Sequence, residues 1–374
     1  MKFTLSSTAL NSRLQTLSKV INSKNALPIL DSFLFEVSNQ QLSITASDSE
    51  NVMQSHLTLD ECDGNGSFAV PNRTILDAMK GLPEQPLTFN VDFQNYTINI
   101  QYQNGQYNFT AQNAEEFPHT DPLSDGATVI TMDAGVLVEN LSRSLFATAN
   151  DELRPVMNGI YFDLTADGLA IVASDGHKLV RNRNFSIKSD SPASFILPKK
   201  PATLLKNVLD KNSGNVVIKF NSQAAEINFE EGVLNCRLIE GRYPNYNAVI
   251  PQNNPNVLVI DRKSLIGALR RVVPFASESS ELIRFHLETG NLEVSSEDID
   301  FATSAKENIT CDYTGQNLSI GFKGSSLQEI LNNLESEAVQ FELADPSRAG
   351  IIIPVDQPEN ENILMLIMPM LLNE

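Results

Sequence analysis

The residues that most resemble catalytic groups are an acid and a histidine in the stretch Asp175-Gly176-His177. An aspartate two residues from a histidine could orient an imidazole that acts as a general base. The sequence has no G-x-S-x-G, H-E-x-x-H or G-x-x-x-x-G-K-[ST] motif that would supply a nucleophile, a metal or a phosphate site. We therefore interpret His177 as part of a loop or pocket wall that follows a strand, and we predict no catalytic residues.

Metal and carboxylate chemistry have little support elsewhere in the chain. The other histidines, His56, His119 and His286, are in no metal-ligand spacing, so we predict no metal site and no cofactor. The pairs Glu115-Glu116 and Glu230-Glu231 lie beside turn signals, and we interpret them as solvated charge. An enzyme that gathers acids from distant strands stays an open alternative to a binding protein.

The composition is typical of a folded protein that needs no disulfide bonds. The chain has 374 residues, 41% of them hydrophobic and 20% charged, which suggests two or three domains. Cys62, Cys236 and Cys311 are widely spaced and form no C-x-x-C pair, so we expect core thiols in a reducing compartment. The first residues lack the apolar stretch of a signal peptide, and no apolar run reaches the roughly 20 residues of a membrane helix. We expect a cytoplasmic protein that does not bind a membrane.

The same landmarks occur three times, at a spacing near one third of the chain. They are an alternating strand followed by small and acidic residues (42–48, 169–175, 292–297), an apolar strand that runs into a helix (68–79, 195–208, 320–331) and a closing stretch (116–118, 242–244, 368–370). Each third also opens with a helix and contains period-2 runs interrupted by turns. The sequence predicts an α+β fold of three repeated domains, at 1–124, 125–251 and 252–374, each with two helices and antiparallel sheets.

Positive charge is concentrated in the predicted helices, although the net charge of the chain is −19. The predicted helical segments are 8–24, 72–81, 134–150, 198–211, 262–271 and 323–336. They contain 15 of the 27 basic residues and only five of the 46 acidic ones. Lysine and arginine form helices well, but so does glutamate, which is nearly absent here. If the helices share one surface, that surface is basic while the rest repels polyanions, which is typical of a protein with one side facing DNA.

No segment resembles a reader of DNA sequence. There is no helix-turn-helix spacing, no Cys/His finger and no tryptophan. Scattered lysines and arginines would give weak phosphate contacts that are independent of sequence, as a sliding protein requires. A scaffold that binds only proteins is the third alternative, but it gives no reason for the charge of the helices.

Five motifs along the chain are shared with one known family. They are Met1-Lys2-Phe3-Thr4, Leu27-Pro28-Ile29-Leu30, Ser174-Asp175-Gly176-His177-Lys178-Leu179, Glu240-Gly241-Arg242-Tyr243-Pro244-Asn245-Tyr246 and Met368-Pro369-Met370. On these residues the chain resembles, from end to end, the β sliding clamp, which is the β subunit of bacterial DNA polymerase III. The resemblance implies a non-catalytic processivity factor: a head-to-tail homodimer that closes as a ring around double-stranded DNA, with helices lining the hole and sheets outside.

The resemblance also implies a peptide pocket between the second and third domains. There the DNA polymerase III α subunit, the clamp loader and other proteins with a clamp-binding motif would dock. At matching positions the pocket consists of Met157, Ser174, Gly176, His177, Lys178, Leu179, Pro244, Val249, Leu366, Ile367, Met368, Pro369 and Met370. Ala248 and Leu371 stand where the family suggests basic residues, so the rim is less cationic in this chain.

The resemblance places two further sets of contacts. Those to DNA are at Lys24, Arg154, Lys199 and Lys200, of which only the last two form a local basic cluster. The dimer interface joins Tyr107 and Phe109 of one subunit to Pro274 and Phe275 of the other.

Overall fold

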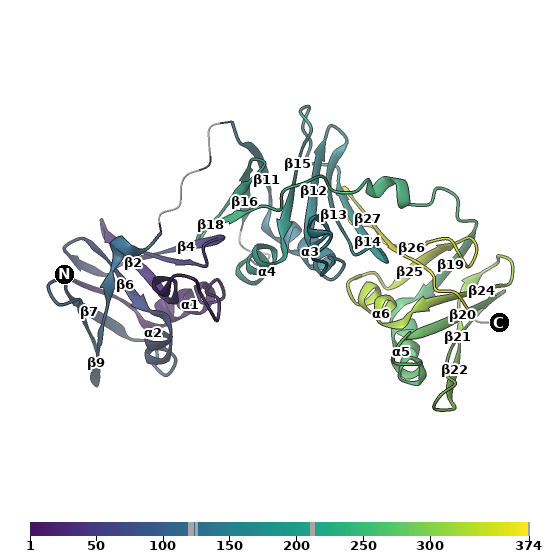
Figure 1. Cartoon of the computed structure of the whole chain (residues 1–374), viewed down its shortest axis with the longest axis horizontal. Coiled ribbons are helices and arrows are strands. Elements are labelled where there is room, and N and C mark those ends of the chain that lie inside the picture. The colour runs from purple at the N-terminus through teal and green to yellow at the C-terminus, as the bar shows by residue number, and fades with distance from the viewer. Residues whose placement is uncertain (119–122, 124–125, 210–213, 373–374) are drawn as a thin grey trace. The chain divides into compact units, whose positions relative to one another are not determined.

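The computed structural model describes residues 1–118, 123, 126–209 and 214–372 (Figure 1). Contacts divide the chain into two compact units, one of residues 1–138 and 203–238 and the other of residues 139–202 and 239–374. Three features of the sequence analysis lie outside the described residues. They are the domain boundary predicted at 124/125, His119, and the last two residues of the predicted helical segment 198–211. The division into three domains at the predicted boundaries stays a prediction.

The first unit contains two antiparallel sheets. Their strands are β1 (Lys2–Ser6), β2 (Ser32–Ser38), β3 (Gln41–Ser47), β4 (Asn51–Thr58), β5 (Glu61–Asp63), β6 (Gly66–Pro71), β7 (Pro86–Asp92), β8 (Thr97–Tyr102), β9 (Gly105–Thr110), β10 (Gln112–Asn113), β11 (Thr128–Asp133), β16 (Asn215–Phe220), β17 (Ala224–Phe229) and β18 (Gly232–Arg237). One sheet has the order β5-β1-β7-β8-β9, and the other has the order β10-β6-β2-β3-β4-β18-β17-β16-β11.

The second unit also contains two antiparallel sheets. Their strands are β12 (Gly159–Thr165), β13 (Gly168–Ser174), β14 (Lys178–Asn184), β15 (Ala193–Pro198), β19 (Asn256–Asp261), β20 (Leu282–Glu288), β21 (Asn291–Asp298), β22 (Thr303–Thr310), β23 (Asp312–Tyr313), β24 (Leu318–Lys323), β25 (Ala338–Leu343), β26 (Gly350–Pro354) and β27 (Glu361–Ile367). The orders are β15-β12-β13-β14-β27-β26-β25-β19-β23 and β22-β21-β20-β24.

Six α-helices lie in the described residues, as predicted. They are α1 (Ser7–Leu17), α2 (Asn72–Met79), α3 (Ala134–Leu145), α4 (Lys199–Val208), α5 (Arg262–Val272) and α6 (Gly324–Asn332). The short 3₁₀ helices are η1 (Pro28–Asp31), η2 (Ala114–Glu116), η3 (Pro155–Met157), η4 (Tyr246–Val249) and η5 (Val273–Phe275). The predicted helix 8–24 was too long, because after α1 the backbone amides bond three residues back instead of four, as Val20 does to Leu17. The predicted helix 134–150 was also too long.

Side-chain patterns explain how the helices join the sheets. Strands such as β20 alternate buried and partly exposed residues, so one face of each is apolar. In the second unit Leu265 and Leu269 of α5 and Ile330 of α6 are fully buried in a cluster that includes Phe285 of β20. The Asp261 carboxylate starts α5 by accepting a hydrogen bond of 2.7 Å from the Ser264 amide.

The strand order repeats three times, which confirms the predicted α+β fold of clamp-type domains. One four-stranded half has the orders β6-β2-β3-β4, β15-β12-β13-β14 and β24-β20-β21-β22. The other half has the orders β1-β7-β8-β9, β11-β16-β17-β18 and β19-β25-β26-β27. Two joints connect halves of successive domains: β4 pairs with β18, and β14 pairs with β27. β9 and β22, the strands at the equivalent positions of the remaining halves, are sheet edges.

The cysteines are only partly the core thiols that we predicted. Cys236 is buried, and this burial raises the pKa of its thiol to about 12. Cys62 and Cys311 are half-buried, since they lie on the short strand β5 and just after the edge strand β22.

Candidate functional site

The joint between β14 and β27 has a second apolar cluster on the face opposite the helices. Leu179 of β14 lies opposite Leu366 of β27, and both are buried. The connecting segment after β18 covers them, with Tyr243 stacked on Tyr161 at a ring distance of 4.6 Å. Tyr246 of the same segment donates a hydrogen bond of 2.8 Å to Asp163. A connector between domains thus forms a wall of this joint.

The structure brings most of the predicted peptide-pocket residues to this joint. Leu179, Leu366, Ile367 and Met157 are buried, Ser174, Lys178, Pro369 and Met370 are partly buried, and Gly176, His177, Pro244, Val249 and Met368 are exposed. The Met368 amide donates to the His177 carbonyl at 2.7 Å, and the Met370 amide donates to the Gly321 carbonyl at 2.8 Å. These bonds hold the segment after β27 between the β13–β14 loop and β24. An apolar surface with a few polar groups suits an extended peptide.

The β13–β14 loop is fixed by the Asp175 carboxylate. Asp175 Oδ1 accepts hydrogen bonds from the amides of His177 (2.8 Å) and Lys178 (2.9 Å). Burial acts to raise the pKa of Asp175, but its hydrogen bonds with Lys178 and His177 outweigh burial and lower it. Gly176 has φ +93°, a conformation that favours glycine. Asp175 thus shapes the loop, and His177 lies in a loop that follows a strand, as we interpreted from the sequence.

Lys178 connects this loop to α6 of the third domain. Its ammonium lies 2.9 Å from Asp175 Oδ2 and 3.1 Å from Glu329 Oε2, and its side chain is 11% exposed. Burial acts to lower the pKa of Lys178, yet the two carboxylates outweigh it and raise the pKa. The lysine is therefore charged and shared between two domains.

Two of the predicted DNA contacts lie around the segment after α3. Lys199 donates to Asn150 at 2.6 Å, and Arg154 pairs with the neighbouring Asp151 at 2.7 Å. The position of a Cβ atom on Gly176 would lie 3.2 Å from an Arg154 nitrogen, so Arg154 is beside the β13–β14 loop. Lys200 is partly buried at the start of α4. Lys24 is exposed. It lies beyond the end of α1, so the prediction that it is part of a helix was wrong.

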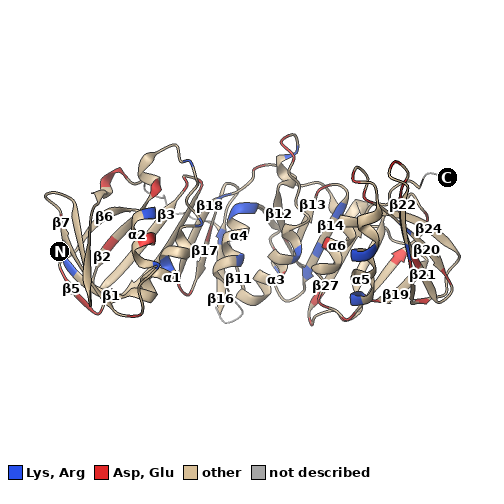
Figure 2. Cartoon of the chain, turned by 90° about the horizontal axis from the view of Figure 1, so that it is seen from below, with Lys and Arg blue, Asp and Glu red and all other residues tan. Residues whose placement is uncertain are grey.

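The helices are basic, though less so than predicted from their longer boundaries. They contain ten basic and three acidic residues, and Figure 2 shows the blue positions on α1, α2, α4 and α5. Several of the basic residues have partners within the protein, among them Arg13 with Glu231 and Arg271 with Glu307. Arg143 is buried and pairs with Glu139 at 3.1 Å. Arg262 donates to backbone carbonyls, including that of Leu331 at 2.9 Å. α6 has no basic residue, so the positive charge is uneven among the helices.

The predicted interface residues lie at two sheet edges. Tyr107 and Phe109 are on the edge strand β9, and both are partly buried. Pro274 and Phe275 are in η5, which contacts β21 and the edge strand β22, and Phe275 is 41% exposed. Edge strands have unpaired backbone groups that can pair with another strand.

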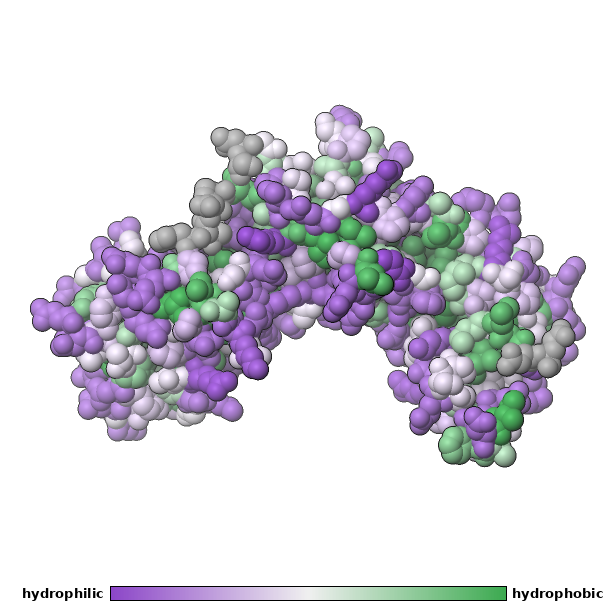
Figure 3. Space-filling view, in the orientation of Figure 1, coloured by the Kyte–Doolittle hydropathy of each residue, from purple (hydrophilic) through white to green (hydrophobic). Residues whose placement is uncertain are grey.

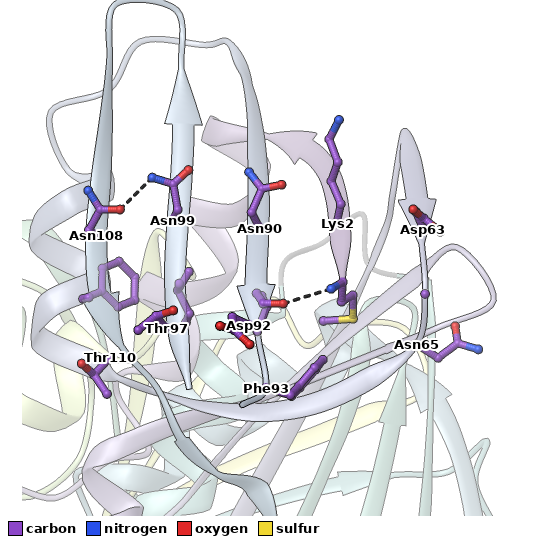
Figure 4. Close-up of a pocket in the computed structure, with 15 residues that line it drawn as sticks. Lys2, Asp63, Asn65, Asn90, Asp92, Phe93, Thr97, Asn99, Asn108 and Thr110 are labelled. Atoms are coloured by element: carbon purple, nitrogen blue, oxygen red, sulfur yellow. Dashed lines mark hydrogen bonds between the residues drawn. The ribbon is translucent and has the colours of Figure 1, made fainter. Parts of the chain in front are cut away.

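A hollow of about 1070 Å³ lies over the outer face of the five-stranded sheet (Figure 4). A row of polar side chains crosses it, with Lys2, Asn90, Asn99 and Asn108 on adjacent strands. The Asn99 amide donates to Asn108 at 2.7 Å. The sequence analysis gave no sign of this hollow, because the row combines residues from separate strands.

The described part of the chain has neither a cluster of candidate metal ligands nor a helix that could span a membrane. No group of three or more His, Cys, Asp and Glu side chains there could hold a metal ion. No helix there is long and apolar enough to cross a membrane.

The sequence analysis missed several residues of the β14–β27 joint. Glu329 is on a helix 151 positions from Lys178 and belongs to no shared motif. Ile351 and Leu364 of the outer apolar cluster could have been found, because β26 and β27 are apolar at positions of both parities, which indicates burial on both faces.

Models of one protein family match nearly the whole chain. The N-terminal domain of the DNA polymerase III beta subunit matches residues 1–121, its central domain matches 131–245 and its C-terminal domain matches 247–371. Among curated relatives, the beta sliding clamp of Pseudomonas aeruginosa is 27% identical, over 99% of this chain and 100% of the relative. That of Vibrio cholerae is 26% identical, over 99% of each.

Solved structures agree over the full length of both chains. A Pseudomonas aeruginosa sliding clamp bound to griselimycin has a TM-score of 0.94 at 26% identity, and the beta subunit from Thermotoga maritima has a TM-score of 0.90 at 26% identity. Both comparisons cover 100% of each chain. Since the three family models together span nearly all of the sequence, the chain belongs to the family of DNA polymerase III beta subunits, the beta sliding clamps, which are non-catalytic processivity factors in DNA replication.

Proposed function

We propose that two copies of this chain close head to tail into a ring, in which β9 of each copy pairs with β22 of the other. The observation that supports this is the repeated joint. β4 pairs with β18 and β14 pairs with β27, and the only halves left unjoined in the described residues end in β22 and β9. Adding the same joint between copies would use both edges, and we propose that the ring closes after two copies. The exposed Phe275 beside β22 would then be covered.

The ring would encircle duplex DNA and hold it by topology. The net charge of −19 opposes long-range attraction, while basic residues on the helices supply scattered phosphate contacts. Lys24, Arg154, Lys199 and Lys200 are our candidates for these contacts. Binding would be independent of DNA sequence, and the clamp could slide.

The outer surface of the β14–β27 joint would bind a short peptide from each partner. Met368 and Val249 are exposed apolar side chains, and they lie close in sequence to Leu366 and Ile250 of the cluster that also contains Leu179. The partners would be the DNA polymerase III α subunit, the clamp loader and other proteins with a clamp-binding motif. We propose that the protein acts in the cytoplasm. We also propose that it consists of three domains with boundaries near residues 124 and 251.

The decisive experiment loads the protein onto nicked circular DNA with a clamp loader and then raises the salt concentration. Screening removes phosphate contacts but cannot unlink a closed ring, so the protein should stay on the circle. Linearising the circle should release it. Loss from intact circles as fast as from linear DNA would contradict encirclement and would favour an ordinary electrostatic binder or a protein scaffold.

A further inference from the structure

The third repeat has a longer hairpin than the other two, and its tip is apolar. Seven positions separate Ala46 from its partner Met53 in β3–β4, and seven separate Ala173 from Val180 in β13–β14. Nine separate Ser296 from Ala305 in β21–β22. The tip of this longer hairpin presents Ile299 and Phe301, which are 82% and 79% exposed. Figure 3 shows hydrophobic residues at the lower right, where Figure 1 places the end of this hairpin.

The tip has a defined conformation. The Asp298 carboxylate accepts hydrogen bonds from the amides of Asp300 at 2.9 Å and Phe301 at 3.2 Å. Ala302 has φ +50° and donates from its amide to the Ile299 carbonyl at 3.3 Å. An ordered turn presents its apolar side chains with little loss of entropy when a partner covers them.

The two joints inside the chain share one register. Met53 faces Leu234 in the first joint, and Val180 faces Met365 in the second. Leu234 and Met365 each lie at the end of a row of residues that pair from strand to strand across the sheet. Each row begins with a residue that lies four positions before the first residue of a helix. The equivalent row in the five-stranded sheet runs from Phe3 to Tyr107. In the joint between copies, Tyr107 should therefore face Ala305.

The hydrogen bonds beyond these pairs place the hairpin tip. The Arg237 amide donates to the Glu50 carbonyl in the first joint, and the Met368 amide donates to the His177 carbonyl in the second. In both joints the donor lies three residues after the residue that ends the row, Leu234 or Met365. The acceptor lies three residues before the residue that faces it on the other strand, Met53 or Val180. The equivalent pair between copies is the Thr110 amide with the Ala302 carbonyl. The longer tip then lies beyond Thr110, at one end of the partner's sheet.

Partly exposed aromatic side chains lie at that end of the sheet. Thr110 pairs with Thr97, which follows the β7–β8 turn, and the Ala111 amide donates to the Tyr96 carbonyl at 2.7 Å. Phe93 and Tyr96 of this turn are partly exposed. Figure 4 shows Phe93 at the same end of the sheet as Thr97 and Thr110.

We propose that the apolar tip at Ile299 and Phe301 packs on the β7–β8 turn of a second copy of this chain and stabilises the closed ring. The occupant is a second copy because the tip continues a joint whose register the chain contains twice. This inference rests on the proposed ring.

The test compares the dimer dissociation constants of Phe301→Ser and Leu153→Ser by analytical ultracentrifugation. Leu153 is also a highly exposed apolar residue, at 92%, in a turn outside this joint, so its variant should dimerise as wild type. Phe301→Ser should raise the dissociation constant on the order of a hundredfold. Burial of one phenylalanine side chain lowers the dissociation constant by at least roughly tenfold, and the ring has two such contacts. In a double-mutant cycle, Tyr96→Ala should remove part of this effect.

Two outcomes separate this inference from the proposed ring. If Phe275→Asp gives monomers while Phe301→Ser dimerises as wild type, the ring stands and the tip contact is refuted. If neither substitution affects dimerisation, the proposed joint between β9 and β22 is itself wrong. A circular dichroism spectrum equal to that of the wild type would exclude misfolding as the cause of any loss.

Discussion

Replacing Lys178 with methionine would test whether its shared ion pair stabilises the pocket loop. The substitution keeps an apolar stem and removes the charge that lies 2.9 Å from Asp175 and 3.1 Å from Glu329. Asp175 would keep only the two amide donors of its own loop, while burial opposes its charge. We expect the variant to lose about 2 kcal/mol of stability at pH 7, the range for losing a charged hydrogen bond at a partly buried site.

The pH dependence of this loss gives a second, independent measure. In the wild type the pKa of Asp175 is lowered by folding, so its contribution is present above the unfolded value of about 3.9 and is lost as the pH falls through the folded pKa. Without Lys178, burial should raise the pKa of Asp175. Protonation of Asp175 then removes the unpaired charge from the variant. The difference in the free energy of unfolding between the variant and the wild type should therefore become smaller between pH 7 and pH 4.

Glu329→Gln is the matched control, because it removes the other carboxylate partner. The Glu329 side chain is 48% exposed, so solvent screens its interaction and we expect a loss of about 0.5 kcal/mol or less. Urea unfolding followed by far-UV circular dichroism at several pH values measures both variants. Our account of the ion pair is refuted if Lys178→Met is no less stable than Glu329→Gln, or if its deficit stays constant from pH 7 to pH 4.

Three further predictions concern the proposed interfaces. Phe275→Asp should give monomers in sedimentation velocity, because the joint would bury an unpaired charge; a dimer of unchanged affinity would assign the interface elsewhere. Val249→Asp combined with Met368→Asp should abolish binding of polymerase-derived peptides in calorimetry, while the fold and the dimer persist. Changing Lys199 and Lys200 to Ala should weaken binding to linear duplex equally for all sequences and reduce the salt slope by roughly one unit per lost contact; an unchanged slope would remove them from the DNA surface.

Local patterns in the sequence were sufficient to predict the repeated elements. Leu265 and Leu269 of α5 have helical spacing and are fully buried, and β20 alternates buried and partly exposed residues, because both patterns come from short-range periodicity. The spacing of three similar landmarks predicted the three clamp-type domains. The predicted C-terminal ends of α1 and α3 were wrong, because helix termination depends on local hydrogen bonds that apolar spacing does not reveal.

The candidate site was predicted only in part, and mainly through resemblance. The motif around His177 indicated a loop at a pocket, and the structure brings this loop to the segment that contains Met368. Tyr243 was within a shared motif, but its stacking on Tyr161 was not predictable from spacing. The DNA candidates Lys24 and Arg154 have no local pattern that distinguishes them from other surface cations.

The sequence by itself determined the elements, their threefold repetition and the excess of basic residues in the helices, because each depends on neighbours within about one helical turn or one hairpin. Only the tertiary structure decided which half-sheets join, that Glu329 of α6 shares Lys178 with Asp175, and that Ile299 and Phe301 stand exposed beyond the edge strand β22. These features depend on which strand edges meet across domains, and strand pairing over long separations is fixed by the packing of whole sheets and not by any local pattern.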